Sequence, residues 1–173
     1  QVAQWLSAAK PVSGRRMEVA STAEGVTVIN DSYNANPESM GAALHALAAM
    51  AKRSDQIRSA RRAIAVLGVM GELGAQSDAA HAEIGRLAVR LGVDELVVIG
   101  PADGESAAIA RGASEQGAGG LSVIVPDVDA AIAHVRGRLR AGDVVLVKAS
   151  KVAGLWRVAD ALLASAGGNG GAR

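Results

Sequence analysis

Residues 26–40 read VTVINDSYNANPESM, and this stretch indicates the fold class. The apolar run at residues 26–30 is typical of a buried strand. The polar turn DSYNAN follows it, and Pro37 then opens a helix, because proline suits the first helical position and Asn36 can cap it. The apolar residues of this helix recur at helical spacing, at Met40, Leu44, Leu47 and Ala51. A strand that leads through a polar turn into a helix is the first half of a βαβ unit.

The same alternation continues along the chain. Four further apolar runs predict strands at residues 63–67, 96–99, 122–125 and 144–147. The other helices are predicted from a Ser77 cap to Gly92, over residues 103–116, from an Asp127 cap to Gly142 with Leu139 facing inward, and from Lys148 through Val152 to Leu162. Apolar strands separated by helices predict an α/β fold, a Rossmann-like three-layer sandwich around a mainly parallel sheet.

The N-terminal part of the sheet is expected to differ from the rest. Residues 17–20 predict another strand, and only the turn at residues 21–25 separates it from the strand at residues 26–30. So short a link suits a hairpin, which makes one strand of the sheet antiparallel. Residues 52–62 are polar and basic and predict a surface loop.

The composition indicates one globular domain. The chain has 173 residues, of which 50% are hydrophobic and 20% charged, so it can bury a core without disulfides or metals. We expect residues 1–166 to form a single domain and the Gly-rich residues 167–173 to be a disordered tail. The chain begins with Gln1 and not with Met, which we interpret as the mark of a fragment or a processed product.

Residue usage excludes several classes of function. Lys and Arg number 18 against 17 Asp and Glu, and aromatic residues make up 2%, which argues against a nucleic-acid partner. Cysteine is absent, so thiol catalysis and thiolate zinc sites are excluded. No apolar run reaches about 18 residues, so no membrane span is expected. The N-terminus lacks the features of a signal peptide, so a cytoplasmic location is expected.

Polar groups follow three of the predicted strands, at the sheet edge where open α/β folds bind ligands. After residues 26–30, Asp31 offers a carboxylate that could accept hydrogen bonds from ribose hydroxyls, and the helix beginning at Pro37 could face an anion. The role of a helix cap explains Asn36 at least as well. The same turn holds Asn34 and Tyr33, the only tyrosine of the chain.

The other two strand ends are GVMGELG at residues 68–74 and Lys148-Ala149-Ser150-Lys151. The GxxGxxG spacing differs from the dinucleotide fingerprint and indicates a tight loop, in which Glu72 is the ionisable group. His81 follows on an apolar helix face, where a satisfied boundary residue is more common than a catalyst. A lysine beside a helix N-terminus can form an anion site, although capping by Ser150 with solvated lysines explains that segment equally well.

The chain lacks the motifs of a complete active site. It has no GxxxxGK[ST] phosphate loop, no HExxH and no GxSxG. We therefore predict no metal site within it.

Taken together, these strings resemble the C-terminal domain of the Mur ligases. The resemblance rests on Arg16-Met17-Glu18, on DSYNANPESM at residues 31–40, on GVMGELG with His81 downstream, and on VLVKASK at residues 145–151, which occur in the family's order. It covers residues 11 to about 163, and DSYNANP is its most specific string.

The sequence departs from the family pattern at three places. Val69 stands where the family often has an acidic residue, and Ala149 stands where it has glycine. An additional arginine makes Arg15 and Arg16 compete for one role, and we favour Arg16 because it directly precedes Met17.

The resemblance implies a domain of an ATP-dependent ligase of peptidoglycan synthesis. In the branch with DSYNANP, ATP phosphorylates UDP-N-acetylmuramoyl-tripeptide, and the amine of D-Ala-D-Ala attacks the acyl phosphate. The resemblance also implies N-terminal and central domains outside this chain, the central one supplying the phosphate loop and most contacts to ATP and Mg²⁺. The present domain would close over the nucleotide and help to hold the dipeptide, which excludes water. It would be inactive alone.

The resemblance also implies roles for individual residues. It places Arg16 near the ATP phosphates and Asp31 on the ribose, with Asn34 and Asn36 shaping the nucleotide side. It makes Lys148 and Ser150 catalytic candidates, which face the reacting groups or the dipeptide carboxylate. The remaining substrate-binding candidates are Tyr33, Glu72 and Lys151.

Two alternatives stay open. The chain could be a stand-alone Rossmann-like nucleotide-binding or interaction module, in which DSYNANP is an elaborate turn. The related folylpolyglutamate synthetases use the same type of domain, although the DSYNANP string favours the muramoyl branch.

Overall fold

A computed structural model describes residues 14–52 and 61–164 of the chain. The predicted tail at residues 167–173 and most of the predicted loop at residues 52–62 lie outside the described residues. Within the described ranges, no helix is both long enough and apolar enough to cross a bilayer.

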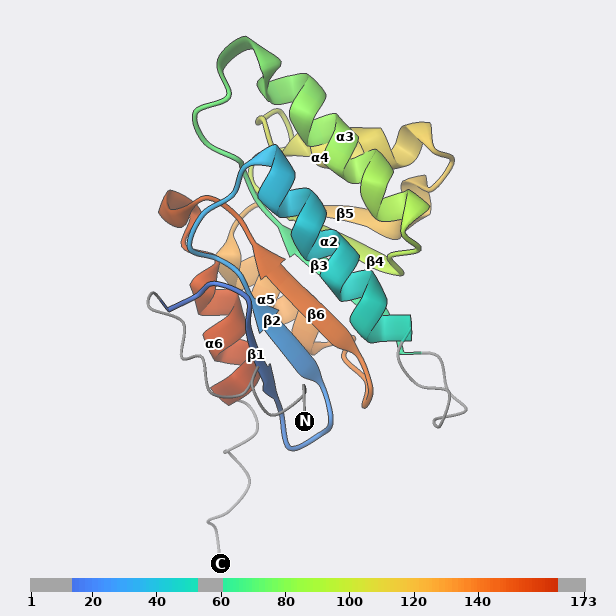
Figure 1. Ribbon diagram of the computed structural model, residues 1–173, viewed down its shortest axis with the longest axis vertical. Coiled ribbons are helices and arrows are strands. Elements are labelled where there is room, and N and C mark those ends of the chain that lie inside the picture. The colour runs from blue at the N-terminus through green and yellow to red at the C-terminus, as the bar shows by residue number, and fades with distance from the viewer. Residues whose placement is uncertain (1–13, 53–60, 165–173) are drawn as a thin grey trace, which may run out of the picture.

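The described residues form a six-stranded sheet with the order β1-β2-β6-β3-β4-β5. Its strands are β1 (Glu18–Ser21), β2 (Thr27–Asn30), β3 (Ala63–Leu67), β4 (Glu95–Ile99), β5 (Ser122–Val125) and β6 (Val144–Lys148). β1 pairs antiparallel with β2, and every other neighbouring pair is parallel. The predicted mainly parallel sheet with one antiparallel N-terminal strand is therefore confirmed. β6, the last strand in the chain, lies in the interior of the sheet between β2 and β3 (Figure 1).

Helices cover both faces of this sheet, which confirms the three-layer architecture (Figure 1). One face carries α2 (Pro37–Lys52), α3 (Ser77–Arg90) and α4 (Ala107–Glu115), and the other carries α5 (Val128–Arg136) and α6 (Trp156–Ala164). Short 3₁₀ turns lie at η1 (Gly74–Gln76), η2 (Gly119–Leu121) and η3 (Lys151–Ala153). The two sides follow from the connections, because parallel strands need crossovers and each crossover helix buries one face.

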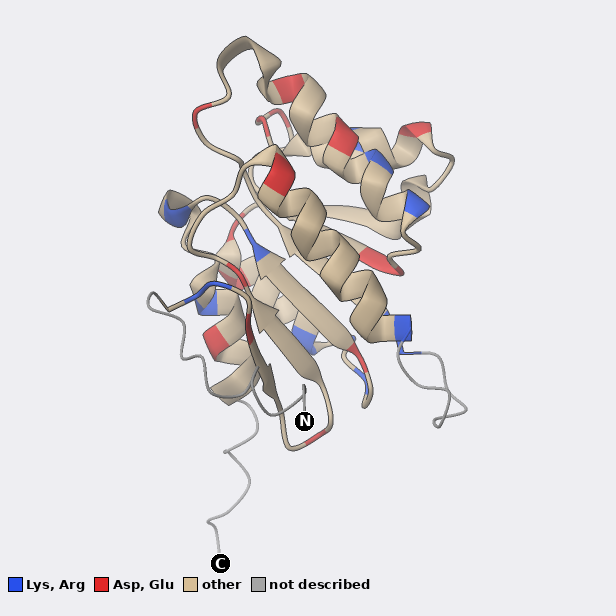
Figure 2. Ribbon diagram, in the orientation of Figure 1, with Lys and Arg blue, Asp and Glu red and all other residues tan. Residues whose placement is uncertain are grey.

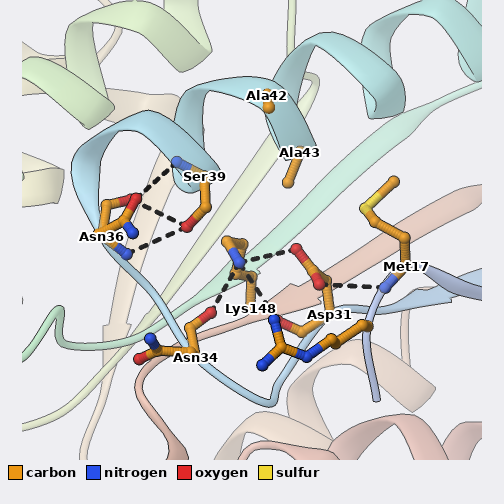
Figure 3. A pocket seen from close by; sticks show the side chains of 9 residues that line it. Met17, Asp31, Asn34, Asn36, Ser39, Ala42, Ala43 and Lys148 are labelled. Atoms are coloured by element: carbon orange, nitrogen blue, oxygen red, sulfur yellow. Dashed lines mark hydrogen bonds and ion pairs between the residues drawn. The ribbon is translucent and has the colours of Figure 1, made fainter. Parts of the chain in front are cut away.

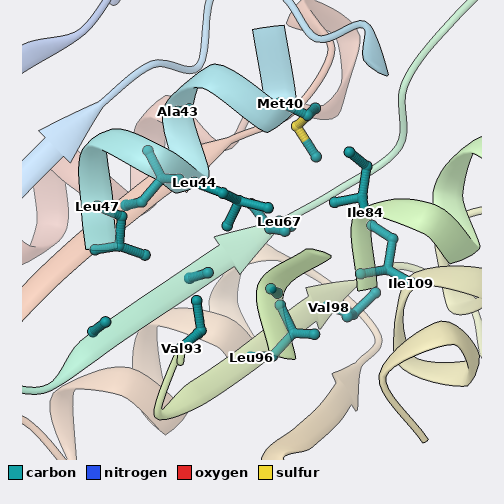
Figure 4. Packing of buried hydrophobic residues seen from close by; sticks show 14 of the residues in the cluster. Met40, Ala43, Leu44, Leu47, Leu67, Ile84, Val93, Leu96, Val98 and Ile109 are labelled. Atoms are coloured by element: carbon teal, nitrogen blue, oxygen red, sulfur yellow. The ribbon is translucent and has the colours of Figure 1, made fainter. Parts of the chain in front are cut away.

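Each layer has its own core. On the α2 side, Met40, Leu44 and Leu47 of α2 are fully buried against the sheet (Figure 4). Fully burying a side chain of this size stabilises the fold by about 2 kcal/mol. Ile84 of α3 and Ile109 of α4 extend the same cluster (Figure 4). Three of the four residues in the predicted stripe of α2 are thus core residues.

α2 carries its charges at its ends, where they suit the helix dipole. Glu38 lies in the first turn and Lys52 in the last, as the red and blue segments of this helix in Figure 2 show. A negative charge at the N-terminus and a positive charge at the C-terminus both stabilise a helix.

Four predicted helix boundaries are wrong. α4 begins at Ala107 and not at residue 103, since residues 102–106 form turns. Ser77 does not cap α3, because η1 precedes it and leaves Gln76 already helical, so no extended cap residue exists. α5 ends at Arg136 and not at Gly142, since Gly137 is a poor helix former, and Leu139 therefore lies beyond the helix.

The last helix begins later than predicted. The segment after β6 forms the single turn η3, and Gly154 then adopts a left-handed conformation with φ 65° before α6 begins at Trp156. Val152, predicted to point inward, is consequently 92% exposed. Leu155, Ala159 and Leu162 are buried as predicted.

Candidate functional site

The candidate site lies where the carboxyl ends of β2 and β6 meet. These strands are parallel neighbours, with Asn30 opposite Val147. The chain leaves β2 toward α2 on one face and leaves β6 toward α6 on the other. Such a switch point opens a crevice at the sheet edge, and the first residue after β2 and the last residue of β6 are Asp31 and Lys148.

Asp31 and Lys148 form a buried ion pair (Figure 3). The Lys148 ammonium donates to Asp31 Oδ2 at 2.7 Å and to the Asn34 carbonyl at 2.7 Å, with a longer contact of 3.5 Å to the Asp31 carbonyl. The Lys148 side chain is only 2% exposed. Its three N–H groups are therefore directed at protein oxygens, and the side chain is not a free surface cation.

Residues 14–17, here called the leading segment, lie beside this pair. The backbone N–H of Met17 donates to Asp31 Oδ1 at 3.0 Å, and the N–H of Tyr33 donates to the Arg15 carbonyl at 3.0 Å. Arg15 and Met17 have φ values of 68° and 47°, left-handed conformations that side chains other than glycine rarely adopt. Contacts with the turn after β2 thus hold a strained backbone.

Three cations of this region stack on aromatic rings. The Arg16 guanidinium lies 4.2 Å from the centre of the Tyr33 ring, and the Lys151 ammonium lies 5.5 Å from it. Arg15 instead stacks on Trp156 at 4.3 Å. Cation–π contacts of this kind fix the direction of a long side chain without neutralising its charge. The two adjacent arginines therefore point to different places, and Arg16 is the one that belongs to the site.

Asn36 caps α2, as predicted. Its side-chain carbonyl accepts from the Ser39 backbone N–H at 2.8 Å, and the Ser39 hydroxyl oxygen accepts in return from the Asn36 N–H at 3.1 Å (Figure 3). This reciprocal arrangement is the geometry of a capping box. The amide group of Asn36 is exposed beyond the cap.

A pocket of ≈ 360 Å³ brings together five of the predicted site residues. It is lined by Arg16, Met17, Asp31, Asn34, Asn36, Ser39, Ala42, Ala43 and Lys148 (Figure 3). All four residues expected on the nucleotide side line it. Its walls carry the exposed Arg16 guanidinium, the Asp31 carboxylate and the two amide groups of Asn34 and Asn36, a set that can bind a phosphate and hydroxyl groups together.

Four other predicted residues lie outside this pocket. Tyr33 and Lys151 adjoin it through the stack with Arg16. Ser150 is 6% exposed. Among the described residues, its hydroxyl is the one buried side-chain polar group without a hydrogen-bond partner. Glu72 is exposed, has φ 63°, and makes no hydrogen bond or ion pair with another described residue.

The glycine loop after β3 packs directly against the segment after β6. A Cβ atom at Gly68 would lie 2.9 Å from the Cβ of Ala149, so the position tolerates no side chain without movement. The Ser150 N–H donates to the Val69 carbonyl at 2.9 Å and so extends the pairing of β3 with β6. The Ala149 methyl group is therefore accommodated by the absence of a side chain at Gly68.

The side chain of His81 in α3 supports this loop. It is fully buried, and its Nε2 accepts from the Met70 backbone N–H at 2.8 Å. The opposite nitrogen, Nδ1, lies 2.7 Å from the Ser77 carbonyl, which fixes the tautomer with the proton on Nδ1. The interpretation of His81 as a satisfied structural residue is confirmed, although it lies in the core and not at its boundary.

A larger pocket of ≈ 520 Å³ opens beyond β4 and β5, and none of the predicted site residues lines it. Its cation, Arg157, is paired with Asp129 at 2.6 Å. Within the described ranges, no three His, Asp or Glu side chains cluster closely enough to bind a metal ion.

Several residues of the pocket were not predicted. Ser39 could have been found, because a polar residue three positions after an Asn cap is the signature of a reciprocal cap. Met17 contributes its backbone N–H, Ala42 and Ala43 contribute bare helix surface, and no sequence signal marks such roles.

This fold and site define a Rossmann-like α/β domain with a polar pocket at a switch point of its sheet. The chain belongs to the Mur ligase family: the family model described as "Mur ligase, glutamate ligase domain" matches residues 15–151. The family expected from the sequence motifs is thus confirmed.

The relatives agree with this assignment. The UDP-N-acetylmuramoyl-tripeptide–D-alanyl-D-alanine ligase of Mycobacterium bovis is 52% identical over 95% of this chain. The match covers 34% of that relative, so the chain spans about a third of its length. The MurF ligase of Thermotoga maritima, solved in complex with ADP, is 28% identical with a TM-score of 0.69, over 92% of this chain and 32% of that one.

The same fold has also been solved as a separate unit. A single ligase domain from Haemophilus ducreyi superposes with a TM-score of 0.53 at 16% identity, and the match covers 87% of this chain and 98% of that one. A domain of this architecture therefore folds without the rest of a ligase.

Proposed function

We propose that this chain is the C-terminal domain of an ATP-dependent ligase that adds D-Ala-D-Ala to UDP-N-acetylmuramoyl-tripeptide in peptidoglycan synthesis. The observation that carries the proposal is the 52% identity over 95% of the chain to a relative of that name. The position of the pocket at a switch point supports it, since nucleotides bind there in related α/β folds.

The chemistry requires activation of a carboxylate. A carboxylate is a poor acyl donor, so transfer of the γ-phosphoryl group from ATP first gives an acyl phosphate and ADP. The D-Ala-D-Ala amine then attacks the acyl carbon, the C–N bond forms, and phosphate leaves with the electrons of the C–O bond. Because water competes with the amine, the domain closes over the reacting groups.

In this proposal the pocket binds the nucleotide. The exposed Arg16 guanidinium, held over Tyr33, approaches the phosphates. Asp31 accepts from the ribose hydroxyls, for which it has capacity because a carboxylate has about four acceptor positions and the protein uses one on each oxygen. Asn34 and Asn36 shape the same wall with their exposed amides.

The dipeptide side is assigned to the segment after β6. The buried Ser150 hydroxyl lacks a partner, and a ligand would supply one. Lys151, the next residue along the chain, lies over the Tyr33 ring, and Glu72 offers an exposed carboxylate for the substrate amine. Lys148 was expected to touch the reacting groups, but its hydrogen bonds favour an indirect role.

Other parts of the enzyme would complete the site. We propose that N-terminal and central domains outside this chain supply the phosphate loop and the Mg²⁺ ligands, and that residues 1–166 form a single domain. Mg²⁺, when bound there, would neutralise phosphate charge. Since the proposed reaction uses ATP and a UDP-linked precursor, we propose that the enzyme acts in the cytoplasm.

The test is phosphate release by the complete ligase. We expect release that requires ATP, the UDP-linked tripeptide and D-Ala-D-Ala together, and Asp31→Ala should raise the KM for ATP or lower kcat strongly. Release with a folate and glutamate instead would indicate a folylpolyglutamate synthetase. If no phosphate is released but ATP binds the 173-residue chain alone, the domain is a nucleotide-binding module.

A further inference from the structure

We infer that Lys148 is a positioning residue: through the Asp31 carboxylate it holds Met17 in its left-handed conformation and so directs Arg16 to the pocket. The contacts are those of the structure, while the expected effect on the KM for ATP rests on the proposed function. In this role Lys148 touches neither the nucleotide nor the dipeptide.

The leading segment needs such a support. Arg15 and Met17 flank Arg16, and both have positive φ. Each left-handed residue other than glycine is strained and persists only where its surroundings hold it. Without that hold, the backbone on either side of Arg16 would relax to extended conformations, and the guanidinium would leave the position that it now has over Tyr33.

Asp31 provides the hold. Among the described residues, its carboxylate is the side-chain group that accepts from the backbone of the leading segment, through the Met17 N–H at 3.0 Å. A hydrogen bond to an ionised acceptor is about twice as strong as a neutral one. The bond joins the left-handed residue itself to the first residue after β2.

Lys148 in turn fixes the direction of Asp31. Its ammonium lies 2.7 Å from Asp31 Oδ2, so one carboxylate oxygen is held by the lysine and the other is left facing Met17 (Figure 3). The lysine cannot swing away, since its Nζ also bonds to the Asn34 carbonyl at 2.7 Å and its side chain is buried. The order of support therefore runs from Lys148 to Asp31, to Met17 and finally to Arg16.

The first experiment measures amide hydrogen exchange at Met17 in the 173-residue chain, which has the size and architecture of a separately solved domain. Lys148→Met removes the ammonium and keeps the length of the side chain. We expect Met17 to exchange about tenfold faster, while the matched control Lys52→Met, at the exposed end of α2, leaves the rate unchanged. An unchanged Met17 rate in folded Lys148→Met overturns the inference.

Removing one partner of a buried pair can prevent folding, so a second variant tests the same step. Asp31→Asn keeps the shape of the side chain and an acceptor for Met17 but removes the charge that Lys148 orients. We expect faster exchange at Met17 here as well. Protection equal to that of the parent chain would overturn the inference independently of Lys148→Met.

The second experiment is a rescue in the complete ligase. Lys148→Met should raise the KM for ATP about tenfold and leave the KM for D-Ala-D-Ala unchanged. Adding Met17→Gly removes the cost of the left-handed conformation, so it should recover at least about threefold of that loss. If Lys148 touched the dipeptide instead, Lys148→Met would raise the KM for D-Ala-D-Ala, and adding Met17→Gly would not lower it again. If the parent ligase releases no phosphate, the proposed function fails, and the exchange experiment still decides the inference.

Discussion

Gly85 of α3 lies so close to Ile109 of α4 that a side chain at Gly85 would overlap the Ile109 carbonyl oxygen. The two helices touch here through backbone, and the overlapped atom cannot move without shifting α4. We predict that Gly85→Ala lowers the free energy of unfolding by about 2 kcal/mol or more, measured by urea denaturation of the 173-residue chain.

A glycine elsewhere in the same helical layer provides the control. At Gly41 in α2 an added Cβ would meet Leu87 at 3.5 Å, an ordinary contact. Gly41→Ala should therefore be neutral or stabilise by up to about 1 kcal/mol. Equal effects of the two substitutions would contradict the close approach of α3 and α4.

The reciprocal cap of α2 predicts a pair of coupled effects. Asn36→Ala removes the acceptor for the Ser39 N–H and should cost about 1 kcal/mol of stability. Asn36→Ser keeps a capping oxygen and should cost only a few tenths. A double-mutant cycle with Ser39→Ala should show coupling between the two residues, and strictly additive losses would argue against the cap.

The support of the glycine loop by His81 is measurable as stability. His81→Leu leaves the buried Met70 N–H without an acceptor, so we expect a loss of about 2 kcal/mol or more. His45→Leu is the comparison, because His45 is exposed on α2 and bonds only to a carbonyl of its own helix. Its loss should stay below about 0.5 kcal/mol, and thermal or urea unfolding separates the two results.

Substitutions of the adjacent residues Arg15 and Arg16 should have different effects, one on stability and the other on nucleotide binding. Arg16 lines the pocket, so Arg16→Ala should raise the KM for ATP in the complete ligase. Arg15 stacks on Trp156, and Arg15→Ala should cost about 0.5–1 kcal/mol of stability with a smaller effect on that KM. The reverse pattern would assign the nucleotide role to Arg15.

A second ion pair, between Arg62 and Asp143, lies at the amino ends of the central strands β3 and β6. Arg62 donates twice to the buried Asp143, at 3.1 and 2.6 Å, and this hydrogen bonding raises the pKa of the guanidinium. Arg62→Met leaves the carboxylate without its cation, so we expect a loss of about 3 kcal/mol. Arg90→Met breaks only the exposed pair with Glu83 and should cost less than about 0.5 kcal/mol. Unfolding curves in urea would show the contrast.

Sequence patterns predicted the sheet more accurately than the ends of the helices. Buried strands such as residues 63–67 show continuous apolar runs because both faces are covered. Helix ends depend on neighbours that the pattern does not contain. After β6, for example, the left-handed Gly154 ends the short turn η3 and leaves Val152 exposed to solvent. The sequence pattern does not show this turn, because it depends on where α6 packs on the sheet.

The candidate site shows the same division. Asp31 and Lys148 were selected from the sequence because they lie at the ends of buried strands, and Arg16 was selected from the resemblance to the Mur ligases. Their partnership was not predictable, since 117 residues separate Asp31 from Lys148 and only the sheet order makes β2 and β6 neighbours. The contact of Met17 with Asp31 was not predictable, because it involves a backbone N–H and a positive φ, and neither depends on the type of side chain.

The central position of β6 also governs how this domain can be synthesised. During translation β2 and β3 emerge long before β6, yet they do not pair with each other in the finished sheet. A nascent chain that ends before Val144 therefore exposes two unpaired strand edges, which are prone to aggregation. The sheet can be completed only when its last strand inserts in the middle, so premature termination removes the whole domain and its candidate site together.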